Sequence, residues 1–288
     1  MKVLVLGSTG MLGSDVLNEL TTRGHAVVAP TSSELDIADP QSVAEITQMD
    51  GIDWCVNCAA YTAVDKAESE EQAAAELNAL GPGYLARACA MKGIKLLHVS
   101  TDFVFDGEAS EPYDELARTN PLGVYGRTKL AGEEAVFAAM PTAIIFRTSW
   151  LYGPNGKSFP KTMIGAWKAG KELRVVADQI GSPTYTRDLA RVIVDALEKD
   201  IYPGTYHATG PDAMTWHDFA VLAVEAYRYA YGIGRAVEIA AIKTEDWPTP
   251  AHRPKYSVLS NKQLLESGIG PMRPTKEALV EFVGLLGE

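Results

Sequence analysis

The stretch Lys2-Val3-Leu4-Val5-Leu6-Gly7-Ser8-Thr9-Gly10-Met11-Leu12-Gly13 decides the fold class. Its apolar first half predicts a buried strand over 2–6, and the apolar residues that follow at helical spacing predict a helix over 10–22. Glycines in such a turn let the backbone bend tightly, approach a pyrophosphate and pack the helix on the strand. The stretch therefore predicts a dinucleotide site, with cofactor contacts at Gly7, Thr9, Gly10, Met11, Leu12 and Gly13.

Strands and helices continue to alternate through the first half of the chain. Further strands are expected over 25–29, 52–57, 95–99 and 142–147, and further helices over 42–48, 72–91 and 121–139. The last helix is expected to start with Asn120 as its N-cap and Pro121 at its first position. After Trp150, prolines divide the chain into short elements, although 186–199 and 215–231 still have helical spacing.

This alternation predicts an α/β fold, a doubly wound parallel Rossmann sheet with a smaller C-terminal α/β domain for the substrate. The expected NAD(P)-binding Rossmann domain comprises 1–150 plus about 184–206. The expected substrate-binding domain comprises about 151–183 plus 207–288.

The amino-acid composition limits the kinds of partner that the protein is expected to bind. The 288 residues include 26 Lys or Arg and 37 Asp or Glu, so the net charge is −11 and no nucleic-acid binding is expected. No apolar run approaches the roughly 18 residues of a membrane span, and the N-terminal apolar stretch is too short for a secretory signal. We therefore expect a cytoplasmic protein with no membrane contact. There are three cysteines, and two of them, Cys55 and Cys58, lie in the buried stretch 54–59 around the end of a predicted strand. They predict neither a disulfide framework nor a metal site.

The end of the second predicted strand bears on the choice of cofactor. A carboxylate there favours NAD, and an arginine favours NADP. The sequence has Ala29-Pro30-Thr31-Ser32-Ser33, which supplies neither. The hydroxyls of Thr31 and Ser32 tolerate both cofactors, so NADPH and NADH both stay open, with NADPH favoured.

Tyr125 and Lys129 form a YxxxK pair within a predicted helix, which places them one turn apart on one face. A lysine ammonium there lowers the pKa of the phenol, so that Tyr125 can exchange a proton with a carbonyl or hydroxyl. Thr101 and Asp102 follow a predicted strand, and catalytic groups of open α/β sheets lie at such strand ends. These residues predict a catalytic group. The alternative is a surface i,i+4 pair with a capping threonine, and Asp102 could equally cap a turn.

With the glycine pattern, these residues resemble the extended short-chain dehydrogenases/reductases. Further stretches narrow the resemblance to the dTDP-4-dehydrorhamnose reductases: NCAAYTAVDKAE over 57–68, STDFVFDG over 100–107, RTSWLYG over 147–153, VADQIGSPT over 176–184 and RPKYS over 253–257. The resemblance runs from residue 7 to about 282. Phe103 departs from it, since the family usually has tyrosine there, and the second strand lacks the family's commoner charged residue.

The resemblance implies an NAD(P)H-dependent reduction of the C4 ketone of dTDP-4-dehydro-L-rhamnose to dTDP-L-rhamnose, a precursor of cell-surface polysaccharide. Tyr125 would protonate the C4 oxygen, Thr101 would hydrogen-bond that oxygen, and Lys129 would hold the nicotinamide ribose. The cofactor contacts that the resemblance adds are Ala59, Ala60, Tyr61, Asp36 and Ile37. Asp36 could instead be a solvated turn residue.

On the substrate side, the resemblance implies contacts from Thr101, Phe103, Trp150 and Arg253. Trp150 would form an apolar wall for the deoxysugar, or else be a core tryptophan at the domain junction. Arg253 would clamp the diphosphate, or else be an exposed loop arginine. The implied partner is a dTDP-sugar, and the family includes monomers and homodimers.

Two other functions fit the same fold. A nucleotide-sugar 4,6-dehydratase or 4-epimerase is one, but dehydratases usually place a glutamate after the Thr-Asp pair, where this chain has Phe103. A non-catalytic regulatory subunit, like the β subunit of methionine adenosyltransferase, is the other. The joint presence of Thr101, Tyr125 and Lys129 argues against it.

Overall fold

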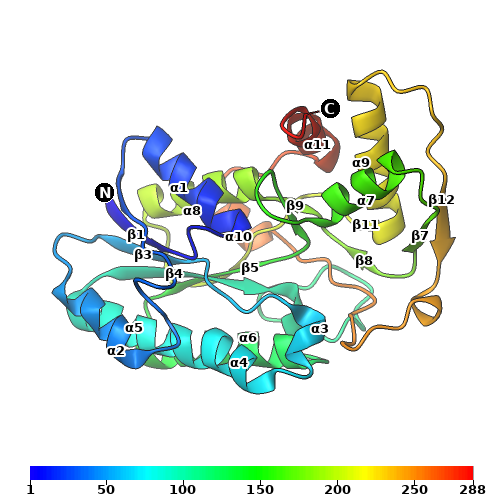
Figure 1. Ribbon diagram of the computed structural model, residues 1–288. Helices are drawn as coiled ribbons and strands as arrows, with labels where there is room; N and C mark the ends of the chain where they lie inside the picture. The colour runs from blue at the N-terminus through cyan, green and yellow to red at the C-terminus, as the bar shows by residue number, and fades with distance from the viewer. Residues whose placement is uncertain (288) are drawn as a thin grey trace.

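A six-stranded parallel sheet runs through the centre of the molecule (Figure 1). Its strand order is β10-β5-β4-β3-β1-β2. The structure is a computed structural model that describes residues 1–287. The strands are β1 (Lys2–Leu6), β2 (Ala26–Val28), β3 (Trp54–Asn57), β4 (Lys95–Thr101), β5 (Ile144–Thr148) and β10 (Gly204–His207). The predicted parallel α/β fold is confirmed.

Helices cover both faces of this sheet. One face carries α1 (Met11–Thr22) and α8 (Thr186–Lys199), and the other carries α2 (Pro40–Ala44), α5 (Gly81–Lys92) and α6 (Val124–Ala139) (Figure 1). Along β1, Val3 and Val5 pack into the first layer, and Leu4 and Leu6 pack into the second. Because both faces of the strand are buried, its sequence is a continuous apolar run rather than an alternating one.

The predicted helix over 72–91 contains a change of winding. It consists of α4 (Glu71–Ala75), the π-helical segment η2 (Glu76–Leu80) and α5. The wider turn carries the fully buried Asn78, whose Oδ1 accepts from the Tyr61 backbone N–H and whose Nδ2 donates to Tyr61 O and Thr128 Oγ1. Short π-helical turns often occur near functional sites, and this one fixes the chain that follows β3.

The predicted start of the helix over 121–139 is wrong. Helix α6 begins at Val124 with Gly123 as its N-cap, three residues later than expected. Asn120 donates from Nδ2 to Asp106 Oδ2 instead of capping the helix. The Val124 N–H donates to Glu68 Oε1, a carboxylate at the end of α3 (Val64–Ala67), so a distant residue supplies the cap.

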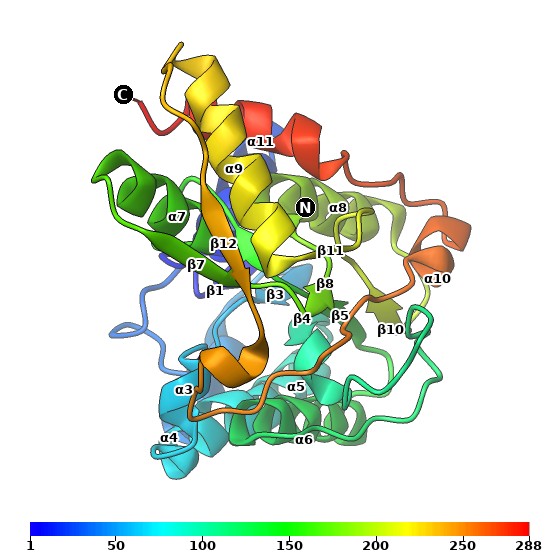
Figure 2. The same cartoon turned by 90° about the vertical axis from the view of Figure 1, so that its right-hand side faces the viewer.

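The chain after β5 forms three small sheets and an aromatic core, which includes Tyr152, Tyr185, Phe219 and Phe282. Three two-stranded pairs lie there: β6 (Leu151–Tyr152) with β9 (Thr184–Tyr185), β7 (Leu173–Val176) with β12 (Ile239–Ile242), and β8 (Ile180–Gly181) with β11 (Met214–Thr215). Figure 2 shows β12 beside α9 (Trp216–Ala230), with α7 (Phe159–Lys168) and α11 (Thr275–Gly284) nearby. The remaining elements are α10 (Lys262–Glu266) and the 3₁₀ turns η1 (Glu45–Gln48), η3 (Asp102–Val104) and η4 (Thr244–Asp246).

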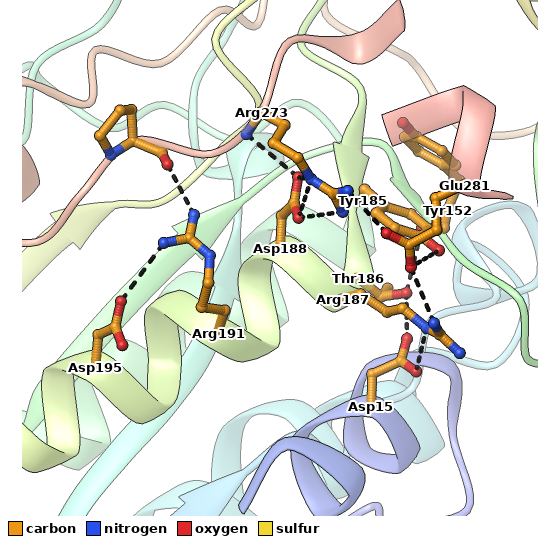
Figure 3. Close-up of polar contacts among 11 residues, drawn as sticks. Asp15, Tyr152, Tyr185, Thr186, Arg187, Asp188, Arg191, Asp195, Arg273 and Glu281 are labelled. Carbon is orange, nitrogen blue, oxygen red and sulfur yellow. Dashed lines mark hydrogen bonds and ion pairs between the residues drawn. The ribbon is translucent and has the colours of Figure 1, made fainter. Parts of the chain in front are cut away.

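A polar network ties α8 to α1 and α11 (Figure 3). Arg273 donates from Nη2 to Asp188 Oδ1 at 2.6 Å and from Nη1 to Glu281 Oε2 at 2.8 Å. Thr186 donates to Asp15 Oδ2 of α1 at 2.6 Å. The C-terminal helix is therefore linked, through α8, to the helix that follows the glycine turn.

Candidate active site

A cavity of about 700 Å³ opens at the carboxyl ends of β1, β3 and β4. The chain passes from β1 to β2 on one side and later returns to β3 on the other, which is where open α/β sheets form a crevice. The predicted site residues that line it are Gly7, Thr9, Gly10, Met11, Leu12, Gly13, Ser32, Asp36, Ile37, Ala59, Ala60, Thr101, Asp102, Phe103, Tyr125, Lys129, Trp150 and Arg253. The structure thus brings together residues from across the chain.

The glycine turn needs two of its glycines for steric reasons. Gly7 has φ +72°, and a Cβ there would lie 2.7 Å from the Ala59 backbone nitrogen. A Cβ at Gly13 would lie 2.1 Å from Gly7 O, because α1 starts directly against the turn. The turn leaves a cradle of bare backbone at a helix N-terminus, which fits the pyrophosphate of a dinucleotide.

Two predicted cofactor residues do not line the cavity. Thr31 donates from Oγ1 to Glu34 Oε2 at 2.9 Å, and its backbone N–H donates to the same oxygen. Tyr61 donates from its hydroxyl to Glu70 Oε2 beside α4. Both hydroxyls are therefore directed to neighbouring carboxylates, while Ser32 and Ala60 next to them do line the cavity.

The catalytic candidates meet where β4 faces α6. Tyr125 and Lys129 lie one turn apart on α6, and both line the cavity. Thr101 Oγ1, at the end of β4, donates to Asp102 Oδ1 at 3.0 Å and accepts from the Phe103 backbone N–H at 3.2 Å. The Phe103 ring packs edge-on to Tyr125 with centroids 5.5 Å apart. An apolar ring therefore stands beside the phenol.

Burial controls the protonation of these groups. It raises the pKa of Tyr125 to about 12, despite a lowering contribution from the Thr101 hydroxyl, and it lowers the pKa of Lys129 to about 8. It also raises the pKa of Asp102 to about 6. The expected lowering of the Tyr125 pKa is therefore wrong for the free chain, because the loss of hydration around the phenol dominates.

Trp150 joins the cavity to the aromatic core. Its ring stacks on Trp216 with centroids 3.5 Å apart, and both residues line the cavity. A Cβ at Gly181 would lie 2.4 Å from the Trp150 ring, so glycine makes room for the indole. Trp150 is thus both a cavity wall and a junction residue.

Arg253 is part of a partly buried ion pair rather than a free loop arginine. Its Nη1 and Nη2 donate to Asp65 Oδ1 and Oδ2 at 3.0 and 2.8 Å. The guanidinium in turn lowers the pKa of Asp65. A carboxylate therefore holds the guanidinium in a fixed orientation at the edge of the cavity.

The sequence predicted no role for four buried polar residues behind the cavity, although Asn57 and Arg147 begin two of the stretches quoted above. Asn57 and His98 hydrogen-bond each other at 3.0 Å, and His98 faces Lys129. Glu133 and Arg147 form an ion pair at 2.6 Å. Polar residues inside the apolar runs of β3 and β4, and a carboxylate one turn beyond Lys129, were signals that could have found them. Within residues 1–287, no cluster of three or more His, Cys, Asp or Glu side chains could hold a metal ion.

Comparison with known proteins gives consistent matches over the whole chain. A family model described as the RmlD substrate binding domain matches residues 1–286. A dTDP-4-dehydrorhamnose reductase of Mycolicibacterium smegmatis is 40% identical over 285 residues, which cover 98% of this chain and 85% of that protein.

Two solved structures are also similar. A dTDP-4-dehydrorhamnose reductase of Clostridium acetobutylicum has a TM-score of 0.92 and 42% identity over 99% of both chains. The Bacillus anthracis dTDP-4-dehydrorhamnose reductase in complex with NADP has a TM-score of 0.91 and 37% identity over 98% of both chains.

Proposed function

The chain belongs to the family described as the RmlD substrate binding domain, and we propose that it reduces the C4 ketone of dTDP-4-dehydro-L-rhamnose to dTDP-L-rhamnose with NADPH or NADH. The observation that carries the proposal is that Thr101, Tyr125 and Lys129 line the same cavity as the glycine turn. The relatives' names and the NADP complex of a similar protein support it.

When bound, NADPH or NADH supplies the hydride that reaches C4. Tyr125 then gives its proton to the C4 oxygen, which gains negative charge. Its pKa of about 12 keeps the phenol protonated at neutral pH, yet well below that of an alcohol, which lies near the value of about 15.7 for water. Proton transfer from Tyr125 to the forming alkoxide is therefore favourable.

Lys129 and Thr101 position the reacting groups. We assign the ammonium of Lys129 to the nicotinamide ribose, where its charge also lowers the pKa of Tyr125. The single hydroxyl hydrogen of Thr101 is directed to Asp102 Oδ1, so Thr101 presents lone pairs toward the cavity. Thr101 therefore reaches the C4 oxygen as a donor only by turning its hydroxyl away from Asp102.

We assign the substrate contacts to residues that line the walls of the cavity. The stacked rings of Trp150 and Trp216 offer an apolar surface to the methyl group of the deoxysugar, with Phe103 beside the phenol. Arg253, oriented by Asp65, is assigned to the diphosphate. The cofactor contacts are assigned to the lining residues of the glycine turn and to Ser32, Asp36, Ile37, Ala59 and Ala60, with Thr31 and Tyr61 as neighbours of that surface.

An assay of the purified protein tests the proposal. Oxidation of NADPH and of NADH is followed in parallel with dTDP-4-dehydro-L-rhamnose. The comparison substrate is dTDP-4-dehydro-6-deoxy-D-glucose, which has the opposite configuration at C3 and C5. Rapid oxidation with the L-sugar is the expected result, and the two rates define the cofactor preference. Oxidation with the D-sugar alone would reassign the substrate. Cofactor binding without turnover of either sugar would instead favour the regulatory-subunit function.

We also propose a cellular location, an oligomeric state and a division into domains. We place it in the cytoplasm as a monomer or homodimer, with residues 1–150 and about 184–206 as the cofactor domain and the remainder as the substrate domain. Among residues 1–287 there is no helix long and apolar enough to cross a membrane. Light scattering during gel filtration measures the mass, which is 31.0 kDa for one chain. A trimer or larger assembly would contradict the proposal.

A further inference from the structure

A buried chain of hydrogen bonds runs from the end of β3 to Lys129. The Ala59 backbone N–H donates to Asn57 Oδ1 at 3.0 Å. Asn57 Nδ2 lies 3.0 Å from His98 Nδ1, and His98 Nε2 lies 3.3 Å from Lys129 Nζ. Asn57 and His98 have no exposed surface, and Lys129 is 2% exposed. Asn57 and His98 are therefore shielded from bulk water, and their polar atoms must be satisfied by each other, by Ala59 and by Lys129.

The direction of each bond follows from what each group can donate. A backbone N–H only donates, so the Asn57 atom facing Ala59 is the carbonyl oxygen, and the amide nitrogen faces His98. The amide nitrogen also only donates, so His98 Nδ1 must be free of hydrogen. Burial lowers the pKa of His98 well below its ordinary value, so the ring is neutral. A neutral ring with a bare Nδ1 carries its hydrogen on Nε2, which faces Lys129.

This tautomer is incompatible with a lysine ammonium at the same place. An ammonium has three donors and no acceptor, so it would meet the Nε2–H donor to donor. A neutral amine has a lone pair to accept from Nε2–H, and it still donates to Val99 O, which lies 2.7 Å from Nζ. Burial, which lowers the pKa of Lys129 to about 8, acts in the same direction.

The other titratable groups near Lys129 add no net charge that would favour its ammonium form over the neutral amine. Burial raises the pKa of the Cys58 thiol, after β3, to about 12, and that of the Tyr125 phenol, one turn earlier on α6, to the same value, so both are neutral. Glu133, one turn later on α6, favours the ammonium. Its charge is balanced by the guanidinium of Arg147 on β5, which lies 2.6 Å away.

We propose that His98 is a positioning residue that keeps Lys129 a neutral amine in the free protein above about pH 8, and that Lys129 takes up one proton when NADPH or NADH binds in this pH range. The ribose hydroxyls assigned to Lys129 can accept from an ammonium, whereas His98 Nε2–H cannot. The proton comes from solvent, and no other bond is made or broken. The second half of this inference rests on the proposed function, because it needs the nicotinamide ribose at Lys129.

Nitrogen NMR of the free protein tests the first half. The histidine ring nitrogens of the ¹⁵N-labelled chain report tautomer and charge, and His98 is one of five histidines, identified by the signal that His98→Gln lacks. The expected signal at about pH 9, where Lys129 is a neutral amine, is a neutral ring with hydrogen on Nε2. A signal for hydrogen on Nδ1, or for an imidazolium, would overturn the inference. This measurement does not depend on catalysis.

Calorimetry tests the second half. NADPH is titrated into the protein at about pH 9 in buffers that differ in ionisation enthalpy. The slope of the observed binding enthalpy against the ionisation enthalpy of the buffer gives the number of protons taken up. With a free pKa of about 8 and an ordinary bound value of about 10.4, the wild-type chain should take up about 0.9 proton. Lys129→Met should take up none. The control Lys168→Met should match the wild type, since Lys168 lies on α7 and contacts Tyr227.

The substitution Asn57→Asp keeps the shape of the side chain but replaces the amide donor that faces His98 with a carboxylate acceptor. A carboxylate accepts from both Ala59 N–H and a protonated Nδ1, which leaves Nε2 as an acceptor for the ammonium. The variant should therefore show the opposite tautomer and lose the proton uptake. Unchanged uptake in Asn57→Asp or Lys129→Met, or none in the wild type, would refute the inference. Failure of NADPH to bind would count against the proposed function, while the NMR result would still decide the role of His98.

Discussion

The buried ion pair between Glu133 on α6 and Arg147 on β5 lies behind the cavity, and its loss should destabilise the protein strongly. The two side chains are 4% and 7% exposed. Arg147 Nε and Nη2 donate to the Glu133 carboxylate at 3.0 and 2.6 Å, and Ser100 Oγ donates to it as well. Glu133→Gln keeps the shape but leaves the guanidinium buried without a counter-charge.

The size of the effect follows from this burial. Removing one partner of a buried ion pair costs about 3–5 kcal/mol. Glutamine retains one carbonyl acceptor, so we expect the lower end, about 3 kcal/mol. For a domain of this size, 1 kcal/mol lowers Tm by roughly 2–4 °C, so Glu133→Gln should lower Tm by roughly 6–12 °C.

Urea and thermal unfolding measure this loss directly. The matched control is Glu134→Gln, the same change at the neighbouring exposed residue, which should stay within about 0.5 kcal/mol of the wild type. Replacing both charges, as Glu133→Met with Arg147→Met, should recover most of the loss, because no unpaired charge remains. If Glu133→Gln is as stable as Glu134→Gln, the ion pair does not support the fold as described.

Three further predictions concern the cavity. Tyr125→Phe should lower kcat by about 10²–10⁴-fold with NADPH affinity retained, and equal turnover in steady-state assays would remove Tyr125 from the mechanism. Gly13→Ala should raise the Kd for NADPH at least about tenfold in fluorescence titrations, because its Cβ meets Gly7 O; Gly165→Ala on α7, where a Cβ meets nothing, should not. Burial raises the pKa of Asp102 to about 6, so the folded chain holds a proton there that the unfolded chain loses near pH 4, and the carboxylate destabilises the fold as pH rises through that window. Asp102→Asn should therefore exceed the wild type in unfolding free energy by up to about 3 kcal/mol at pH 7 in urea titrations, and a gain that persists below pH 4 would contradict this reasoning.

Most of the fold could be predicted because the residues that determine each element lie close together in the sequence. The apolar run over 2–6 and the glycines after it lie within one stretch of chain, and they became β1, the turn and α1 as expected. The helix over 186–199 was predicted to the residue. Strand β10 was not predicted, because Gly-Thr-Tyr-His has no apolar run, and only its place beside β5 makes it a strand.

The errors share a physical cause, which is that the deciding partner lies far away in sequence. Glu68 caps α6 from 56 positions away, so no local pattern could place that helix start. The pKa of Tyr125 depends on how deeply the folded chain buries the phenol, which the YxxxK spacing does not report. The hydrogen-bond chain through His98 likewise joins residues 41 and 31 positions apart. The catalytic roles themselves stay predictions.

The fate of the transferred hydride tests the proposed reaction at the reacting carbon itself. The purified chain is incubated with dTDP-4-dehydro-L-rhamnose and NADPH that carries deuterium at the transferred position, and the product is analysed by mass spectrometry and proton NMR. We expect dTDP-L-rhamnose with one deuterium, located at C4. A product without deuterium, deuterium at another carbon, or no product from a folded chain that binds NADPH would contradict the proposed reaction.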